Sequence, residues 1–400
     1  MRQNFKLTSL RHEGEDKCCL SFLSLEQAEK IRQYHATFPM YAPTPLNCMP
    51  ETAAMLGLGN VYVKDESKRF GLNAFKVLGG SYAIGHELAD MLGKPMEEID
   101  GSLLTSQETK RQLGEITFIT ATDGNHGRGV AWTATQVGMK SVVYMPKGSA
   151  RERLENIKAA GADASITDMN YDDTVRLACA HAKENGWVLV QDTSWDGYEK
   201  IPQRIMQGYC TMGLEALEQL PEKPTHIFLQ AGVGSMAGAI AGFFASVYGE
   251  DRPRIVIVEP EKADCLYRTA EANDGKLHSV SGDMDTIMAG LACGEPCGLA
   301  WEILKHCADD FISCPDYVAA KGMRILGNPA GKDARMISGE SGASAFGCAA
   351  EIATNPDLAW LKEKLGLDKH SRVLFFSTEG DTDKENYRAI VWDGKYPARP

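Results

Sequence analysis

Residues 226–248 read HIFLQAGVGSMAGAIAGFFASVY and contain, in order, a candidate strand, a glycine-rich turn and a candidate helix. The run His226–Gln230 is short and mostly apolar, which is typical of a buried strand. Met236–Tyr248 is apolar and long enough for a helix. At a helix start, free backbone N–H groups and the helix dipole favour an anion such as a phosphate group. The turn residues that would form this anion site are Gly232, Val233, Gly234 and Ser235.

The glycine spacing of this turn also resembles a dinucleotide-binding fingerprint. The next candidate strand ends in Glu259, an acidic residue of the kind that binds a ribose in such sites. A dinucleotide fingerprint normally opens its domain at the first strand, whereas this turn lies past the middle of the chain. An NAD-dependent oxidoreductase therefore stays open as a weaker alternative.

The rest of the chain repeats the alternation of strand and helix. Helical patterns such as Arg151–Ala160 and Asp172–Asn185 lie between short runs rich in β-branched and aromatic residues. This alternation predicts an α/β fold with open, mostly parallel sheets that carry helices on both faces. The expected strands are Val61–Lys64, Thr117–Thr120, Ser141–Met145, Ala164–Thr167, Trp187–Gln191, His226–Gln230, Arg254–Glu259 and Arg372–Ser377.

The order of these elements also indicates two domains. The polar stretch Lys94–Glu115 is interpreted as a connector into a second sheet, because four short strand candidates follow it up to Asp192. We therefore expect a small α/β domain at residues 90–196. It would be inserted into a larger domain made of residues 1–89 and 197–400.

Composition and charge exclude several classes of partner. The chain has 400 residues and a net charge of −12, so it lacks the basic stripe that nucleic-acid binding needs. No apolar run follows the basic residues of the N-terminus, and the longest apolar stretch is too short to cross a bilayer. Eleven scattered cysteines indicate free thiols in a reducing cytoplasm rather than a disulfide framework.

A second motif, GLNAFKVLGGSY at residues 71–82, places one lysine among apolar neighbours. Lys76 follows Phe75 and precedes Val77 and a glycine pair. Taken alone, the stretch fits a surface lysine at a helix start. An amine in an apolar pocket has a lowered pKa, however, and becomes nucleophilic toward an aldehyde. Lys76 is therefore a candidate Schiff-base lysine.

A third motif, TDGNHG at residues 122–127, follows a candidate strand and precedes a helix through Ala131–Val137. Such a turn offers backbone N–H groups that suit a substrate carboxylate. The alternative is a simple helix start capped by Asp123. The candidate substrate-binding residues are Thr122, Asp123, Gly124, Asn125 and His126, with His126 expected to have a mainly structural part.

A fourth motif, FSTEGD at residues 376–381, closes the last candidate strand. Two hydroxyls, those of Ser377 and Thr378, stand where an open α/β sheet binds its ligand, at the carboxyl end of a strand. A turn capped by a hydroxyl is an equally good interpretation of this motif alone.

The four motifs in this order resemble the tryptophan-synthase-like, fold type II enzymes that depend on pyridoxal phosphate (PLP). Within that group the chain resembles the diaminopropionate ammonia-lyases, over about Tyr41 to Tyr387. The runs that carry this resemblance are KDESKRFGLNAFK, TDGNHGRGVAW, MPKGSA, TDMNYDDTVRL, QAGVG, IMAGLACGEP, ISGESGA and STEGDTD.

The resemblance implies a role for each motif. Lys76 would hold PLP, Asn125 would bind the ring oxygen, and residues 232–235 would hold the phosphate. Ser377, with Thr378 as the alternative, would contact the pyridine nitrogen. Thr122 and Asp123 depart from the serine and small residue of the broad pattern, which disfavours a simple serine or threonine dehydratase.

The implied reaction removes ammonia from 2,3-diaminopropionate through an aminoacrylate that hydrolyses to pyruvate and ammonia. Lys76 and Asp123 are candidate bases on opposite faces, so both the L and the D isomer would react. Asp192, at a strand end, is a candidate for binding the second ammonium of the substrate. A neutral hydroxyl at the pyridine nitrogen favours rapid loss of the β group over transamination.

Other interpretations stay open beside this one. They are a serine/threonine dehydratase or a racemase of the same fold, and a non-catalytic ligand sensor that kept the fold. The resemblance also implies a homodimer. Glu340 either lies near the cofactor or caps a turn. No metal is expected, because the spacing of four possible ligands fits buried structural residues better than a zinc site: Cys293, Cys297, His306 and Cys307.

Overall fold

The computed structural model describes residues 5–10, 19–122 and 124–397. Its larger sheet has seven strands in the order β1-β10-β9-β8-β11-β3-β2, and its smaller sheet has four in the order β6-β5-β4-β7. The larger sheet contains β1 (Lys6–Ser9), β2 (Leu46–Cys48), β3 (Asn60–Asp65), β8 (His226–Gln230), β9 (Arg254–Pro260), β10 (Asp310–Cys314) and β11 (Arg372–Ser377). The smaller sheet contains β4 (Thr117–Ala121), β5 (Lys140–Met145), β6 (Asp163–Ile166) and β7 (Val188–Leu189).

Both sheets are mainly parallel, as the alternation in the sequence predicts. All pairings in the smaller sheet are parallel, and in the larger sheet only the edge strands β1 and β2 pair antiparallel. The sequence did not predict β1, β2 or β10. The first two are only four and three residues long. In β10, Asp310 and Ser313 interrupt the apolar run, and both are buried with polar partners, Arg254 and Asp264.

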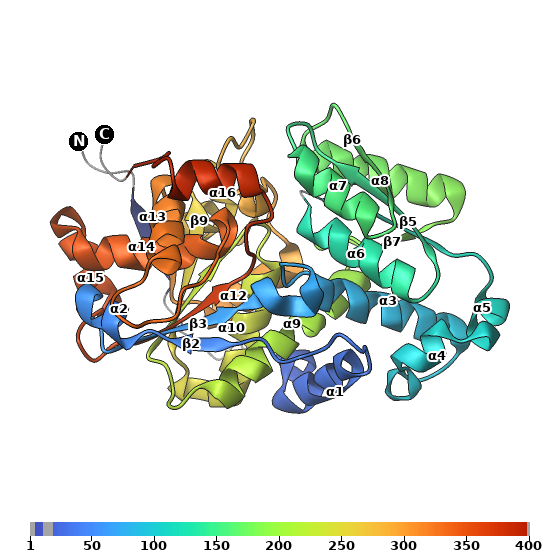
Figure 1. Cartoon of the computed structure of the whole chain (residues 1–400), viewed down its shortest axis with the longest axis horizontal. Coiled ribbons are helices and arrows are strands. Elements are labelled where there is room, and N and C mark those ends of the chain that lie inside the picture. The colour runs from blue at the N-terminus through green and yellow to red at the C-terminus, as the bar shows by residue number, and fades with distance from the viewer. Residues whose placement is uncertain (1–4, 11–18, 123, 398–400) are drawn as a thin grey trace.

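Helices cover both faces of each sheet (Figure 1). The stretch interpreted as a connector, Lys94–Glu115, leads into β4 and contains two short helices, α4 (Gly101–Thr105) and α5 (Gln107–Leu113). Their starts are capped by the side chains of Asp100 and Ser106. The helices are α1 (Leu25–Ala36), α2 (Pro50–Leu56), α3 (Val77–Leu92), α4 (Gly101–Thr105), α5 (Gln107–Leu113), α6 (Asn125–Gln136), α7 (Arg151–Ala159), α8 (Tyr171–Asn185), α9 (Lys200–Gln219), α10 (Ser235–Tyr248), α11 (Cys265–Ala272), α12 (Gly298–Cys307), α13 (Tyr317–Gly327), α14 (Glu340–Thr354), α15 (Ala359–Leu365) and α16 (Lys384–Val391).

The smaller sheet carries one apolar cluster on each face. Buried side chains of α8 pack on β4 and β5 on one face, and those of α6 and α7 pack on β5 and β6 on the other face. The four strands lie within residues 117–189, inside the range expected for the small domain. Helix α3 continues across position 89/90, so one helix joins the two parts. The domain boundaries themselves stay a prediction.

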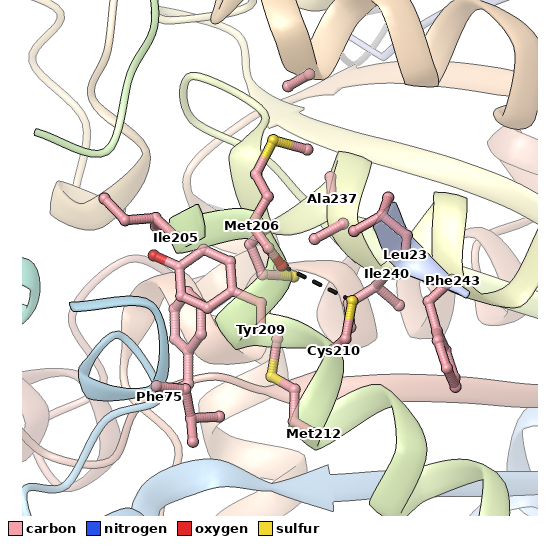
Figure 2. Packing of buried hydrophobic residues seen from close by; sticks show 14 of the residues in the cluster. Leu23, Phe75, Ile205, Met206, Tyr209, Cys210, Met212, Ala237, Ile240 and Phe243 are labelled. Carbon is pink, nitrogen blue, oxygen red and sulfur yellow. Dashed lines mark hydrogen bonds between the residues drawn. The ribbon is translucent and has the colours of Figure 1, made fainter. Parts of the chain in front are cut away.

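The largest apolar cluster lies where α3, α9 and α10 meet the larger sheet (Figure 2). Phe75 packs on Tyr209 of α9 with ring centroids 4.8 Å apart. Helices α3 and α9 approach so closely that a Cβ on Gly208 would lie 2.4 Å from the carbonyl oxygen of Leu78. This packing fixes the start of α3, and with it the position of Lys76, against the core.

A cluster of four buried charges stabilises the segment between β3 and α3. Arg69 donates to Glu66 at 2.9 Å and to Glu215 at 2.8 Å, and Lys64 lies 2.8 Å from Glu215. All four side chains are at most 1% exposed. Although burial alone raises the pKa of Glu215, its contacts with Arg69 and Lys64 lower that pKa to about 2. The charges balance, which is what makes their burial tolerable.

Among the described helices, none combines the length and the apolarity that a membrane span requires.

Candidate active site

One cavity of about 660 Å³ brings the predicted motifs together. It lies at the carboxyl ends of β4, β8 and β11, where an open parallel sheet binds ligands. The predicted residues that line it are Lys76, Asn125, Asp192, Gly232, Val233, Gly234, Ser235 and Thr378.

Lys76 stands directly before α3 and points at Asp192. Its Nζ donates to Asp192 Oδ2 at 2.9 Å, and both side chains are largely buried, at 17% and 6% exposed. Although burial alone raises the pKa of Asp192, the charge of Lys76 lowers it to about 2. Asp192 is therefore an anion at neutral pH, and it contacts the amine that the sequence marks as the nucleophile.

The glycine-rich turn leads from β8 into α10, as the sequence predicts. Gly234 precedes the helix with φ of +101°, a conformation that favours glycine. A Cβ on Gly234 would point into protein, 3.1 Å from Leu266 Cδ1, and one on Gly232 would lie 3.1 Å from Leu291 Cα. The Ser235 hydroxyl donates to the Asp192 carbonyl at 2.7 Å, so the turn and Asp192 hold each other in place.

In the turn after β4, Thr122 and His126 are buried in the protein, whereas Asn125 lines the cavity. The Thr122 hydroxyl accepts from the amides of Gly124 and Gly127, at 3.0 and 3.2 Å, and is buried away from the cavity. His126 is also buried, with Nε2 2.7 Å from the Val190 carbonyl oxygen. Asn125 does line the cavity, and its amide donates to Glu379 Oε2 at 2.5 Å. Asp123 lies outside the described residues.

The two hydroxyls at the end of β11, on its last residue Ser377 and on the next residue Thr378, face different ways, because successive side chains of an extended chain alternate. Ser377 Oγ donates to Ser338 Oγ at 2.7 Å, and Ser377 is not among the residues that line the cavity. Thr378 lines the cavity and accepts from Gln230 Nε2 at 2.9 Å. The structure therefore favours Thr378, our alternative, over Ser377 as the residue that faces a bound ring.

Several residues of the cavity were not singled out from the sequence. Glu379 is 1% exposed and accepts from Asn125 and from the Ser341 amide, while Tyr171 Oη lies 3.4 Å from Asp192 Oδ1. Glu340, for which the sequence left two interpretations open, begins α14 and lines the cavity, and burial together with nearby Glu379 raises its pKa to about 7. Glu379 and Tyr171 both belong to runs that carry the family resemblance, and that was the available signal.

The acidic residue of the dinucleotide interpretation and the possible metal ligands can now be placed in the fold. Glu259 accepts from the amides of Leu266 and Tyr267 at 2.9 and 2.6 Å, so it holds the start of α11 and is buried. It cannot bind a ribose there, and the dinucleotide interpretation is wrong. Cys297 is buried 3.1 Å from Ser194 Oγ, whereas Cys293 lines the cavity. Within the described ranges no three His, Cys, Asp or Glu side chains form a possible metal site.

Comparison with known proteins identifies the family. The model of the pyridoxal-phosphate dependent enzymes matches residues 37–361. The diaminopropionate ammonia-lyase of Escherichia coli strain K12 is 53% identical over 381 residues, which cover 94% of each chain. The chain belongs to the diaminopropionate ammonia-lyases.

Solved structures of this family have the same fold. The holo diaminopropionate ammonia-lyase from Escherichia coli matches with a TM-score of 0.93 and 49% identity over 100% of both chains. Its complex with D-serine matches with a TM-score of 0.92 and 48% identity over 98% of both. The fold class, the enzyme class and the PLP cofactor expected from the sequence are thus confirmed.

The cavity itself fits PLP. It places a lysine amine, a helix N-terminus with a glycine-rich turn, an amide and a hydroxyl around one space, and these match the aldehyde, phosphate, ring oxygen and ring nitrogen of the cofactor. The roles of the individual residues stay predictions, and two experiments test them.

We expect Lys76 to carry PLP. Its amine reaches the cavity and is held by Asp192. Borohydride reduction of the holoenzyme, followed by peptide mapping, should place the pyridoxyl group on Lys76. A label on any other lysine would contradict the assignment.

Gly234→Val should raise the PLP dissociation constant severely, by about 10- to 100-fold, because a β-branched residue is strained by ~1–3 kcal/mol at this positive φ. The turn would then change its conformation beneath the phosphate. Gly249→Val is the matched control, because Gly249 ends the same helix with φ of +58° and open space around its Cβ. Equal loss of PLP in both variants would show that strain in α10, and not the turn, causes the loss.

Proposed function

We propose that the chain eliminates ammonia from 2,3-diaminopropionate. The aminoacrylate product would hydrolyse to pyruvate and a second ammonia. The observation that carries the proposal is the charged Asp192, buried in the cavity 2.9 Å from the Schiff-base candidate Lys76. A fixed anion at this place suits a substrate with two amines better than one with a hydroxyl. The function of the Escherichia coli relative supports the same substrate.

The residues of the cavity divide the reaction among them. PLP, when bound, supplies an aldehyde for the substrate amine and a ring that withdraws electrons from Cα. Lys76 Nζ takes the proton as the Cα–H bond breaks on its face, and neighbouring Asp192 stabilises the ammonium so formed. The electron pair forms the Cα=Cβ bond while the Cβ–N bond of the β-ammonium breaks, and the nitrogen leaves as ammonia with the electron pair of that bond.

Binding of the two ends of the substrate is assigned to two elements. The turn that contains Asn125, at the start of α6, would hold the carboxylate with backbone N–H groups. Asp192, with Tyr171 3.4 Å away, would hold the second ammonium before it leaves. Thr378 would face the pyridine nitrogen, and residues 232–235 would bind the phosphate.

The proposal is tested by the rate of pyruvate release from purified holoenzyme. We expect kcat/KM for diaminopropionate to exceed that for serine or threonine by at least about tenfold, since one hydrogen bond to a charged group contributes ~1.5–3 kcal/mol. A larger kcat/KM for serine or threonine would instead identify a dehydratase of the same fold.

We further propose two bases, Lys76 for the L isomer and Asp123 for the D isomer. The α-hydrogens of the two isomers point to opposite faces of a bound cofactor, so one fixed base cannot reach both. The Escherichia coli relative has been solved with D-serine, which fits a site open to D amino acids.

Asp123→Asn should therefore lower kcat/KM for D-diaminopropionate by about 10²–10⁴, the usual loss for a general base, and retain much of the activity on the L isomer. Steady-state kinetics on each isomer, in wild type and variant, provide the measurement. Equal losses on both isomers would mean that Asp123 positions the substrate, and the two-base scheme would have to be abandoned.

We also propose a homodimer in the cytoplasm. The dimer rests on the family resemblance, and the location rests on eleven scattered cysteines. Light scattering at assay concentration should give twice the mass of the chain. The mass of a single chain would refute the dimer.

A further inference from the structure

Gln230 and Thr378 form a hydrogen-bonded pair on neighbouring strands of the larger sheet. Gln230 ends β8, and Thr378 directly follows β11, which pairs with β8 in parallel. Gln230 is 1% exposed and lines the cavity together with Thr378. Its Nε2 donates to the Phe376 carbonyl oxygen and to Thr378 Oγ1, both at 2.9 Å.

Chemistry fixes the orientation of the Gln230 amide. A backbone carbonyl can only accept, so the group that faces the Phe376 oxygen must be the NH2 and not the amide oxygen. Rotation of the amide by 180° would set two acceptors against each other. In the described part of the chain, Gln230 Oε1 has no hydrogen-bond partner. The amide is thus held by its two N–H donors, and one of them is always directed at Thr378.

This contact decides what Thr378 can offer to the cavity. A threonine hydroxyl has one proton and two lone pairs, and the Gln230 N–H occupies one lone pair. The proton must therefore point elsewhere, and the Thr378 hydroxyl donates to no other described residue. Because Thr378 lines the cavity, its O–H is available there as a donor.

We propose that Gln230 is a positioning residue that fixes Thr378 as a hydrogen-bond donor to the ring nitrogen of PLP. A nitrogen that accepts this bond is unprotonated, and its ring withdraws electrons only weakly. A weakly withdrawing ring does not store the electrons left at Cα, so loss of the β-amine is favoured over return of a proton to Cα. The proposal rests on the cofactor of the family and on Thr378 facing the ring, and it holds for any β leaving group.

Two substitutions of Gln230 should shift the protonation equilibrium of the ring nitrogen, Gln230→Glu more than Gln230→Met. Gln230→Met removes both donors at nearly constant volume, so the Thr378 hydroxyl can turn freely. In Gln230→Glu, a protonated carboxyl oxygen at the place of Nε2 has one proton, which it can donate to the Phe376 oxygen, and it can accept from the Thr378 hydroxyl with a lone pair. The Thr378 lone pairs then face the ring and favour its protonated form.

The measurement is the ¹⁵N resonance of the holoenzyme loaded with PLP labelled at the ring nitrogen. Wild type should give the resonance of an unprotonated pyridine. The protonation equilibrium should shift toward the protonated ring by about fivefold in Gln230→Met and further in Gln230→Glu, since one hydrogen bond is worth ~1 kcal/mol. In a protein that already carries Thr378→Val, neither Gln230 substitution should move the resonance, because Gln230 acts on the ring nitrogen only through the Thr378 hydroxyl.

The matched control is Asn355→Leu, which removes a buried side-chain amide that donates to Glu351 and does not line the cavity. It should leave the resonance unchanged. A protonated ring in wild type, an unchanged resonance in both Gln230 variants, or an equal shift in the Thr378→Val background would each overturn the proposal. Failure of wild type to release pyruvate from diaminopropionate would refute the proposed substrate, and the ¹⁵N series would still decide the role of Gln230.

Discussion

The contact between Lys76 and Asp192 is the interaction on which the site depends. Lys76 follows β3 of the larger sheet, and Asp192 follows β7 of the smaller one, so this ion pair joins the two parts across the cavity. The Asp192 carbonyl also accepts from Ser235, at the start of α10. One residue therefore sets the distance between the amine and the anion-binding turn, and its charge is balanced by the lysine that it holds.

The groups that line the cavity are themselves held by buried partners. Asn125 donates to Glu379, and Thr378 accepts from Gln230, so two groups assigned to the cofactor ring have fixed orientations before a ligand binds. Glu379 follows Thr378 directly in the chain. The end of β11 thus provides two residues that line the cavity, Thr378 and Glu379, and Glu379 fixes Asn125. Such supporting contacts keep a site in its working geometry.

Local patterns predicted most of the fold and singled out the motifs that the folded chain brings around one cavity. The eight expected strands are present because buried parallel strands are apolar runs, although the strand expected at Trp187–Gln191 is reduced to Val188–Leu189. The choice between Ser377 and Thr378 depended on which face of β11 meets the cavity, and a two-residue alternation cannot reveal that without the neighbouring strands. The pairing of Lys76 with Asp192 joins positions 116 apart, and only the folded chain brings them together.

The balanced cluster of Lys64, Glu66, Arg69 and Glu215 has a consequence for how this chain can evolve. Each of its charges is compensated by the others and is shielded from water, so replacement of any one leaves an uncompensated ion in the core. The four residues therefore cannot be replaced one at a time without a loss of stability. They can be retained together or exchanged together for apolar residues of similar volume, and an intermediate sequence has to pass through a less stable protein.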